Sequence, residues 1–235
     1  MDACLEDAAS VLDRERQTLE WIRNKSATIY RLVELYNSAE EACRRFDTRA
    51  GMGVYLKWPV DLRGRRDDSS WIHVGGLMHV RDGVIDNMSH YLCVTRGEAS
   101  SQRQRVLRKY HFDYASRDIR TQRRSSVFHL QYPGKLPPEL KGGYDDGHLD
   151  SWLEEPRIFF MPMSLSLLLH LAFREFPNEY TNRLCEDGEW QSVHVHRDQT
   201  CLIVPFLETC VSVASDTKKK LLWDAACEPA AWHAE

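Results

Sequence analysis

The sequence predicts an α+β fold with a long N-terminal helix or helical hairpin, a mainly antiparallel sheet, a buried central helix and a short C-terminal helix. Three observations support this prediction. Residues 3–46 carry apolar side chains at helical spacing, and no proline occurs before Pro59. Strand-like segments then follow one another to residue 132 without the intervening helices that a parallel sheet requires. Ser164–Phe176 is a leucine-rich stretch that ends at Pro177.

The N-terminal element, residues 1–50, has an apolar stripe along one helical face. A heptad pattern that starts at Leu5 places apolar residues at most of its a and d positions. Ser26 can cap a second helix, so one long helix and a helical hairpin remain alternatives. The stripe packs either on the protein's own sheet or against a partner helix, including that of a second copy. The candidate partner-binding residues are Leu12, Leu19, Ile22 and Ile29.

The rest of the chain, residues 51–235, is predicted to be one α+β domain with a sheet of six to eight strands. Asp82-Gly83 between two strand-like runs indicates a hairpin, and Gly75-Gly76 indicates a bulge. The central helix should be buried because its leucines leave little polar surface. Residues 190–197 and 200–213 are predicted to form another hairpin. The expected strands elsewhere are 54–58, 71–78, 84–94, 106–115 and 126–132, and the expected C-terminal helix is 216–233.

Composition favours a soluble cytoplasmic protein. The seven cysteines are widely spaced and include no C-x-x-C pair, which is typical of free thiols in a reducing compartment. The acidic N-terminus lacks the apolar region of a signal peptide, and no apolar run approaches the roughly 18–20 residues of a membrane span. Motifs of P-loop, Rossmann, α/β-hydrolase and zincin sites are absent. No metal, cofactor or membrane association is therefore predicted.

Local charge is segregated although the net charge is only −4. Nine basic and three acidic residues lie between Arg96 and Arg124, whereas six acids and one lysine lie between Glu139 and Glu155. The two segments can be solvated or packed on each other. The basic strip can instead bind nucleic acid, although no recognised binding motif accompanies it. Its candidate contacts are Arg117, Arg120, Arg123 and Arg124.

Two short strand-like segments carry the best candidate catalytic site. His111 and Asp113 lie two residues apart on one segment, as do His129 and Gln131 on the next, so each pair shares a strand face. We expect the two strands to pair, with Arg157 nearby. Two histidines and an arginine provide a general base, a general acid and a phosphate-binding cation, with Asp113 orienting a histidine. His111, Asp113, His129 and Arg157 could thus cleave RNA without a metal.

The other histidines have simpler interpretations. His194 and His196 would share one face of a predicted strand, where paired histidines are usually exposed but can bind zinc if a third ligand is present. His73 and His79 would share a face of another strand, unless the predicted bulge at Gly75-Gly76 changes the alternation. His170, inside the leucine-rich helix, is expected to be a core residue bonded to a carbonyl.

The run His111-x-Asp113, His129-Leu130-Gln131, Pro156-Arg157-Ile158 and Met163-Ser164-Leu165 before an apolar helix resembles uncharacterised bacterial proteins encoded near defence and toxin–antitoxin genes. The resemblance covers residues 105–180. It implies a prokaryotic cytoplasmic accessory or toxin-like component, as in a CRISPR-type system, and it brings no known catalytic residues.

The leading hypothesis is a non-enzymatic accessory protein of a prokaryotic defence system that acts by binding another protein. The missing catalytic motifs, the near-neutral charge and the apolar N-terminal stripe favour it. One alternative is a metal-independent ribonuclease or toxin that uses His111 and His129. Another is a nucleic-acid-binding module that uses the strip Arg96–Arg124.

Overall fold

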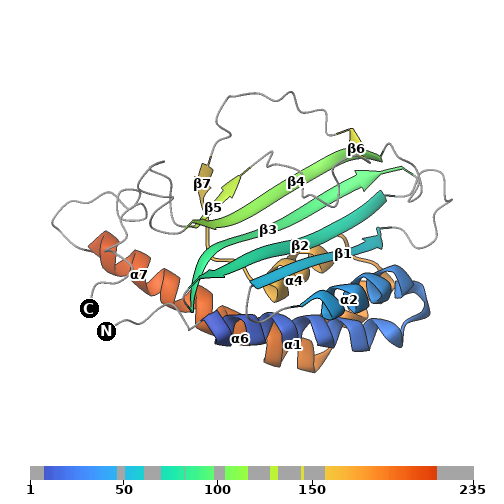
Figure 1. Cartoon of the computed structure of the whole chain (residues 1–235), viewed down its shortest axis with the longest axis horizontal. Coiled ribbons are helices and arrows are strands. Elements are labelled where there is room, and N and C mark those ends of the chain that lie inside the picture. Colours follow the sequence, from blue (N-terminus) through green and yellow to red (C-terminus); the bar gives the residue numbers. More distant parts are fainter. Residues whose placement is uncertain are drawn as a thin grey trace.

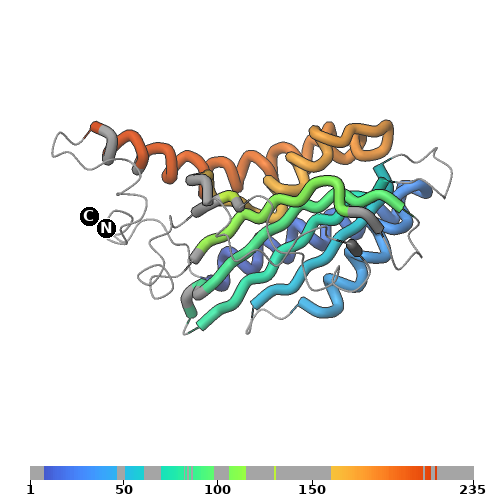
Figure 2. Tube along the Cα trace, turned by 90° about the horizontal axis from the view of Figure 1, so that it is seen from above, coloured from blue at the N-terminus to red at the C-terminus, as the bar shows by residue number. Residues whose placement is uncertain are grey.

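The computed structural model describes residues 8–46, 51–60, 70–81, 83–97, 104–115, 128–131, 144–145 and 157–215. A twisted sheet forms one layer, and the helices α1, α2 and α4 cover one of its faces (Figure 1). The view from above shows the same arrangement and a long helical run that passes beyond the ends of the strands (Figure 2). The fold is therefore α+β, as predicted.

The N-terminal element is a helical hairpin. Helix α1 (Ala8–Ala27) is followed by the 3₁₀ turn η1 (Tyr30–Leu32) and by helix α2 (Val33–Arg45). The prediction that Ser26 caps the second helix is wrong, because Ser26 lies inside α1 and its buried hydroxyl donates to the carbonyl of Ile22 at 2.6 Å. A serine on a buried helix face commonly satisfies its hydroxyl on the preceding turn.

Six strands lie side by side, with every neighbouring pair antiparallel, and a seventh short strand pairs with β4 in parallel. This number, counted over the described residues, agrees with the predicted six to eight. In spatial order the strands are β1 (Gly51–Pro59), β2 (Ser70–Arg81), β3 (Val84–Arg96), β4 (Gln104–Ala115), β5 (Phe128–Gln131) and β7 (Arg157–Phe159), and the seventh is β6 (Tyr144–Asp145).

Helix α2 protects the edge strand β1. The hydroxyl of Ser38 accepts a hydrogen bond from the backbone N–H of Lys57 at 3.1 Å, and the Lys57 ammonium lies 3.6 Å from the Glu34 carboxylate. An edge strand otherwise presents unpaired backbone groups to other chains. The helical hairpin therefore closes this side of the sheet as well as covering its face.

The glycine pair in β2 does not form a bulge, and that prediction is wrong. The register runs unbroken through Gly75 and Gly76 and shifts only between His79 and Val80. A Cβ on Gly75 would collide with the hydroxyl of Tyr91, and one on Gly76 would lie 2.8 Å from the His90 ring. The two glycines thus make room for large side chains on the neighbouring strand. The hairpin turn is as predicted, with Gly83 at φ +76°.

The predicted central helix is α4 (Leu165–Glu175). The hydroxyl of its N-cap, Ser164, accepts from the backbone N–H of Leu167 at 3.3 Å. Helix α4 packs on β2, β3 and α1, and most of its leucines are buried, as expected. The core that it shares with the hairpin and the sheet contains Leu12, Leu19, Ile22, Leu35, Leu56, Trp58, Ile72, Leu92, Leu168 and Phe173.

Residues 190–213 are helical, so the predicted second hairpin is wrong. After α5 (Glu179–Glu186), a continuous helical run comprises the π-helical segment η4 (Trp190–Val195), α6 (His196–Asp198), the π-helical segment η5 (Gln199–Ile203) and α7 (Val204–Ser215). Trp190, His194 and Asp198 are buried at every fourth position. Burial on one helical face therefore outweighs the β-propensity of the valines. The predicted helix 216–233 lies outside the described residues.

None of the helices in the described ranges is long and apolar enough to cross a membrane. Cys43, Cys93, Cys185, Cys201 and Cys210, the cysteines within those ranges, are free thiols.

Candidate functional site

The strand register brings the candidate catalytic residues to neighbouring positions. His111 is directly opposite Gln131 and Asp113 is opposite His129, so the expected pairing of these two strands is confirmed. Gln131 is in turn opposite Arg157 on β7. Positions directly opposite in antiparallel strands share a face of the sheet. The side chains of His129, Gln131 and Arg157 lie outside the described part of the structure, so their geometry toward His111 stays a prediction.

The same face carries a hydrogen-bonded chain that the sequence did not reveal. The Tyr55 hydroxyl lies 2.8 Å from Nδ1 of His73, and Nε2 of His73 lies 2.9 Å from the Thr95 hydroxyl. Burial, with a contribution from Lys57, lowers the pKa of His73 to about 3. The ring is therefore neutral at physiological pH and bridges the two hydroxyls with one donor and one acceptor nitrogen. Such a weak base orients Tyr55 rather than removing its proton.

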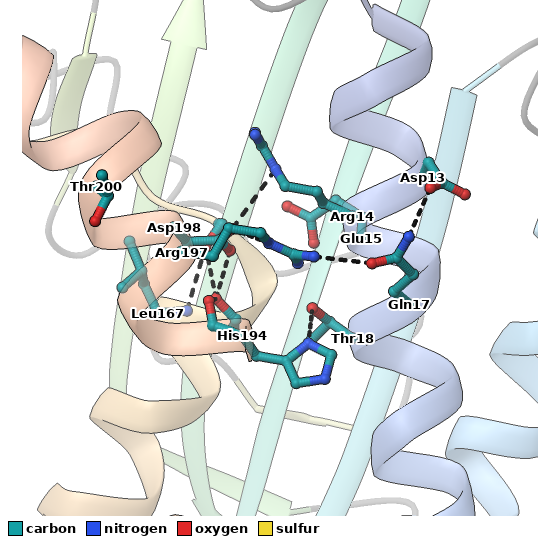
Figure 3. A network of polar contacts seen from close by, with 12 residues as sticks. Asp13, Arg14, Glu15, Gln17, Thr18, Leu167, His194, Arg197, Asp198 and Thr200 are labelled. Carbon is teal, nitrogen blue, oxygen red and sulfur yellow. Dashed lines mark hydrogen bonds and ion pairs between the residues drawn. The ribbon is translucent and has the colours of Figure 1, made fainter. Parts of the chain in front are cut away.

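A second polar cluster lies on the helix-covered side of the sheet (Figure 3). We call it the Glu15 cluster. It joins α1, β3, the start of α4 and the helical run after α5, and nearly all its side chains are less than a tenth exposed. Its members are Arg14, Glu15, Thr18, His90, Ser164, Ser166, His194, Arg197 and Asp198.

Asp198 is the negative centre of the Glu15 cluster. The Ser166 hydroxyl donates to its Oδ2 at 2.5 Å, and its Oδ1 lies 3.5 Å from Nε of Arg14 and 3.4 Å from Nε of Arg197. Arg197 also donates to Gln17 at 2.8 Å. Both cations are thus directed at Asp198, which balances its charge in a buried setting.

Glu15 and His90 form the other half of the cluster. Both carboxyl oxygens of Glu15 accept from the backbone N–H of Leu165, at 3.2 and 3.1 Å. Burial, and then the Asp198 carboxylate, raise the pKa of Glu15 to about 8. Nε2 of His90 lies 3.8 Å from Oε1 of Glu15, and burial lowers the pKa of His90 to about 4.

His194 belongs to this cluster and not to a strand pair with His196. Its Nδ1 lies 3.2 Å from the Thr18 hydroxyl, and its ring stacks on Trp190 at 5.5 Å. His194 is buried whereas His196 is exposed, because two helical residues two apart point in different directions. The predicted shared face is therefore wrong. No group of three or more metal-ligating side chains occurs within the described ranges.

Four other sequence predictions remain, and the structure describes the residues of three of them. Leu12, Leu19 and Ile22 are at most 1% exposed, and Ile29 packs partly buried against the same core, so a partner could reach them only if they left the core. His170 is half-buried, and among the described residues its Nδ1 accepts from the indole of Trp190 at 3.3 Å and no carbonyl bonds to its ring. His73 and His79 share a face, as their spacing indicates. Arg117, Arg120, Arg123 and Arg124 lie outside the described residues.

An exposed apolar stripe lies on α7, the last described helix. Val204, Leu207 and Val211 are 45%, 52% and 65% exposed. At about 100° per residue, their positions fall within one narrow arc of the helix. Phe206, on another side, is buried. Both views show α7 extending past the ends of the strands (Figures 1 and 2). We call these three residues the α7 stripe.

No protein-family model, curated protein or solved structure matches this chain.

Proposed function

We propose that this protein is a non-enzymatic interaction protein that binds a partner protein through the α7 stripe. The main observation in support is that Val204, Leu207 and Val211 are exposed on a helix that extends past the sheet. Positions i, i+3 and i+7 are the anchors by which a helix enters an apolar groove. The resemblance of residues 105–180 to defence-associated proteins adds the proposal that the partner is a component of a prokaryotic defence system.

The chemistry of α7 favours a groove over a second copy of the chain. Glu208, exposed at one flank of the stripe, is the only charged residue in Val204–Ser215, so the helix suits an apolar groove with a polar rim on that flank. Seven residues of helix span about 10 Å. Two such short stripes packed on each other would bury far less than the roughly 1,200 Å² of a stable interface. A groove contacts the helix on both flanks and buries more of it.

The test compares stripe variants with a matched control on the same helical run. The full-length protein is used as bait in its native host, and the components that it retains are purified and titrated against it. Leu207→Asp and Val211→Asp should each weaken binding at least tenfold, because a charge would enter an apolar groove. Val193→Asp, at an exposed valine outside the stripe, should bind as the wild type does.

Equal binding by all the variants would contradict the proposal. Light scattering of the isolated protein provides a second check. A dimer that the stripe variants dissociate would show that a second copy, and not a partner's groove, occupies the stripe, and it would equally overturn the proposal.

A metal-independent ribonuclease is the second candidate, and the strand register favours it. His111, Asp113, His129 and Arg157 lie at adjacent register positions on β4, β5 and β7. We propose that, if the protein is an enzyme, the two histidines act as general acid and base on a phosphodiester. RNA cleavage without added metal should then be lost in His111→Ala and His129→Ala, and be retained in His79→Ala, an exposed histidine on β2.

Binding of nucleic acid through the strip Arg96–Arg124 is the third candidate and is not favoured. We expect no RNA or DNA binding tighter than micromolar at physiological salt. If the protein instead binds RNA or DNA with nanomolar affinity, and Arg120→Ala, Arg123→Ala and Arg124→Ala abolish this binding, nucleic-acid binding becomes the favoured function. The log–log salt slope would then be about −0.7 to −0.9 per phosphate contacted.

A further inference from the structure

Glu15 is a carboxyl group on the buried face of α1, next to apolar core residues such as Leu12, Leu19 and Ile22. It is 3% exposed and lies where α1 meets β3 and the first turn of α4 (Figure 3). Its only backbone donor among the described residues is the N–H of Leu165. An isolated buried carboxylate is costly unless cations or several donors compensate it.

The charged groups around Glu15 supply that compensation only in part: Arg14 and Arg197 favour its ionised form, but burial and Asp198 outweigh them and raise its pKa. Arg14, on its own helix, and Arg197, on α6, both direct their Nε atoms at Asp198. Asp198 is a second carboxylate and opposes ionisation of Glu15. His194, on η4, bonds to Thr18. Nε2 of His90, on β3, lies 3.8 Å from Oε1 of Glu15.

His90, like Glu15, is a buried polar group with too few hydrogen-bond partners. Its ring is fully buried, and neither nitrogen has a hydrogen-bond partner in the described structure. The distance of 3.8 Å from Nε2 of His90 to Oε1 of Glu15 exceeds a hydrogen bond, so direct pairing requires one of the two side chains to rotate. A protonated carboxyl can donate to a neutral imidazole nitrogen. A proton on Glu15 donated to Nε2 would give one ring nitrogen of His90 and the carboxyl group a partner without creating a buried charge, while Nδ1 of His90 stays without a partner in the described structure.

We propose that Glu15 and His90 form a neutral buried pair that holds one proton in the folded protein. We further propose that loss of this proton is a pH-sensitive switch that weakens the packing of the helical run Trp190–Ser215 on α1 and α4. An ionised Glu15 would face Asp198 across the buried cluster, and the repulsion is relieved if the helix that carries Asp198 moves away. Asp198 lies between the π-helical segments η4 and η5. Such segments are rare and often occur at functional positions.

The direction of both pKa shifts agrees with a neutral pair. The pKa of Glu15 is raised to about 8 and that of His90 is lowered to about 4, whereas an ion pair would shift each in the opposite direction. Loss of the proton would therefore occur slightly above neutral pH.

The first experiment measures the unfolding equilibrium constants of the wild type and Glu15→Gln by urea titration at a series of pH values. The glutamine amide can still donate to His90 and accept from Leu165. The ratio of the wild-type constant to the Glu15→Gln constant should rise about tenfold per pH unit up to about pH 8 and then level off. Glu20→Gln, at an exposed glutamate on the same helix, should stay parallel to the wild type. A pH-independent ratio for Glu15→Gln would overturn the proposal.

Infrared spectroscopy of the wild-type protein tests the proton directly and does not depend on the variant folding. A carbonyl band of a protonated carboxylic acid should be present at neutral pH and disappear on titration through about pH 8. Its absence at neutral pH would overturn the neutral pair.

Amide hydrogen exchange tests the switch. After correction for intrinsic rates, exchange at residues 190–203 should be at least fivefold faster at about pH 9 than at about pH 7 in the wild type, and unchanged in Glu15→Gln. Equal exchange in the wild type at the two pH values would overturn the switch.

Discussion

The Ser166 hydroxyl donates a 2.5 Å hydrogen bond to Oδ2 of Asp198 and thereby joins the first turn of α4 to the helical run that ends in α7. Both side chains are at most 2% exposed. The bond links segments 32 residues apart in the chain. It fixes the position of a helix whose exposed end carries the α7 stripe.

Ser166→Ala should lower the free energy of unfolding by about 1.5–3 kcal/mol, because the buried Asp198 carboxylate then loses its shortest hydrogen bond. Ser192→Ala is the matched control. Its hydroxyl donates to the Gly188 carbonyl at 2.7 Å on an exposed face, and its loss should change stability by less than about 0.5 kcal/mol. Urea titration of both variants measures the difference, and equal losses would show that the Ser166 bond is not a special link.

Gly75→Ala should destabilise the fold by about 1–3 kcal/mol. The added Cβ would collide with the Tyr91 hydroxyl and with the backbone carbonyl of Val54, which cannot move aside easily. Gly53→Ala is the control in the same sheet, because its Cβ would meet only Leu77 Cδ1, at 3.9 Å. If thermal or urea unfolding gives the two variants the same stability, Tyr91 does not pack as closely against Gly75 as described.

His73 should make the fold less stable in acid. The pKa of His73 is lowered from its ordinary value of 6.5 to about 3 in the folded protein. Between pH 6.5 and about pH 3 the unfolded chain therefore binds a proton that the folded protein does not. The contribution of His73 to the free energy of unfolding is therefore complete above pH 6.5, and it decreases by about 1.4 kcal/mol for each pH unit below that. The difference in unfolding free energy between the wild type and His73→Gln should shrink accordingly.

The exposed His79, on the same strand, provides the comparison for that profile. His79→Gln should keep the wild-type pH dependence. A His73→Gln profile that runs parallel to the wild type from neutral pH to about pH 4 would mean that His73 titrates normally.

Leu12→Asp with Leu19→Asp should unfold the chain rather than dissociate a complex. Each leucine is at most 1% exposed in the core between α1, α4 and the sheet, and burial of one leucine is worth roughly 1.5–3 kcal/mol before the cost of a buried charge. Circular dichroism would detect the loss of helical structure, and light scattering would detect any change in mass. Tyr30→Asp, at a site that is 84% exposed, should remain folded. If the double variant stays folded and its mass changes, the N-terminal stripe is a binding surface and not part of the core.

Local patterns determined several elements on their own. The density of leucines between Ser164 and Pro177 predicted α4, because a cap and a proline mark its ends. Asp82-Gly83 predicted the hairpin between β2 and β3, since glycine adopts the positive φ that the turn requires. The alternation of His111 with Asp113 and of His129 with Gln131 predicted that these positions would be neighbours once β4 and β5 paired.

Tertiary packing decided the rest. Residues 190–213 contain five valines and carry no cap signal, yet they are helical because Trp190, His194 and Asp198 enter the buried interface with α1 and α4. The Tyr55–His73–Thr95 chain depends on the register of three strands, which no single segment encodes. Glu15 falls at a d position of the N-terminal stripe, where the sequence shows only an interruption of the apolar pattern. Its chemistry arises from His90, Leu165 and Asp198, which lie far away in the chain and meet it only in the folded core.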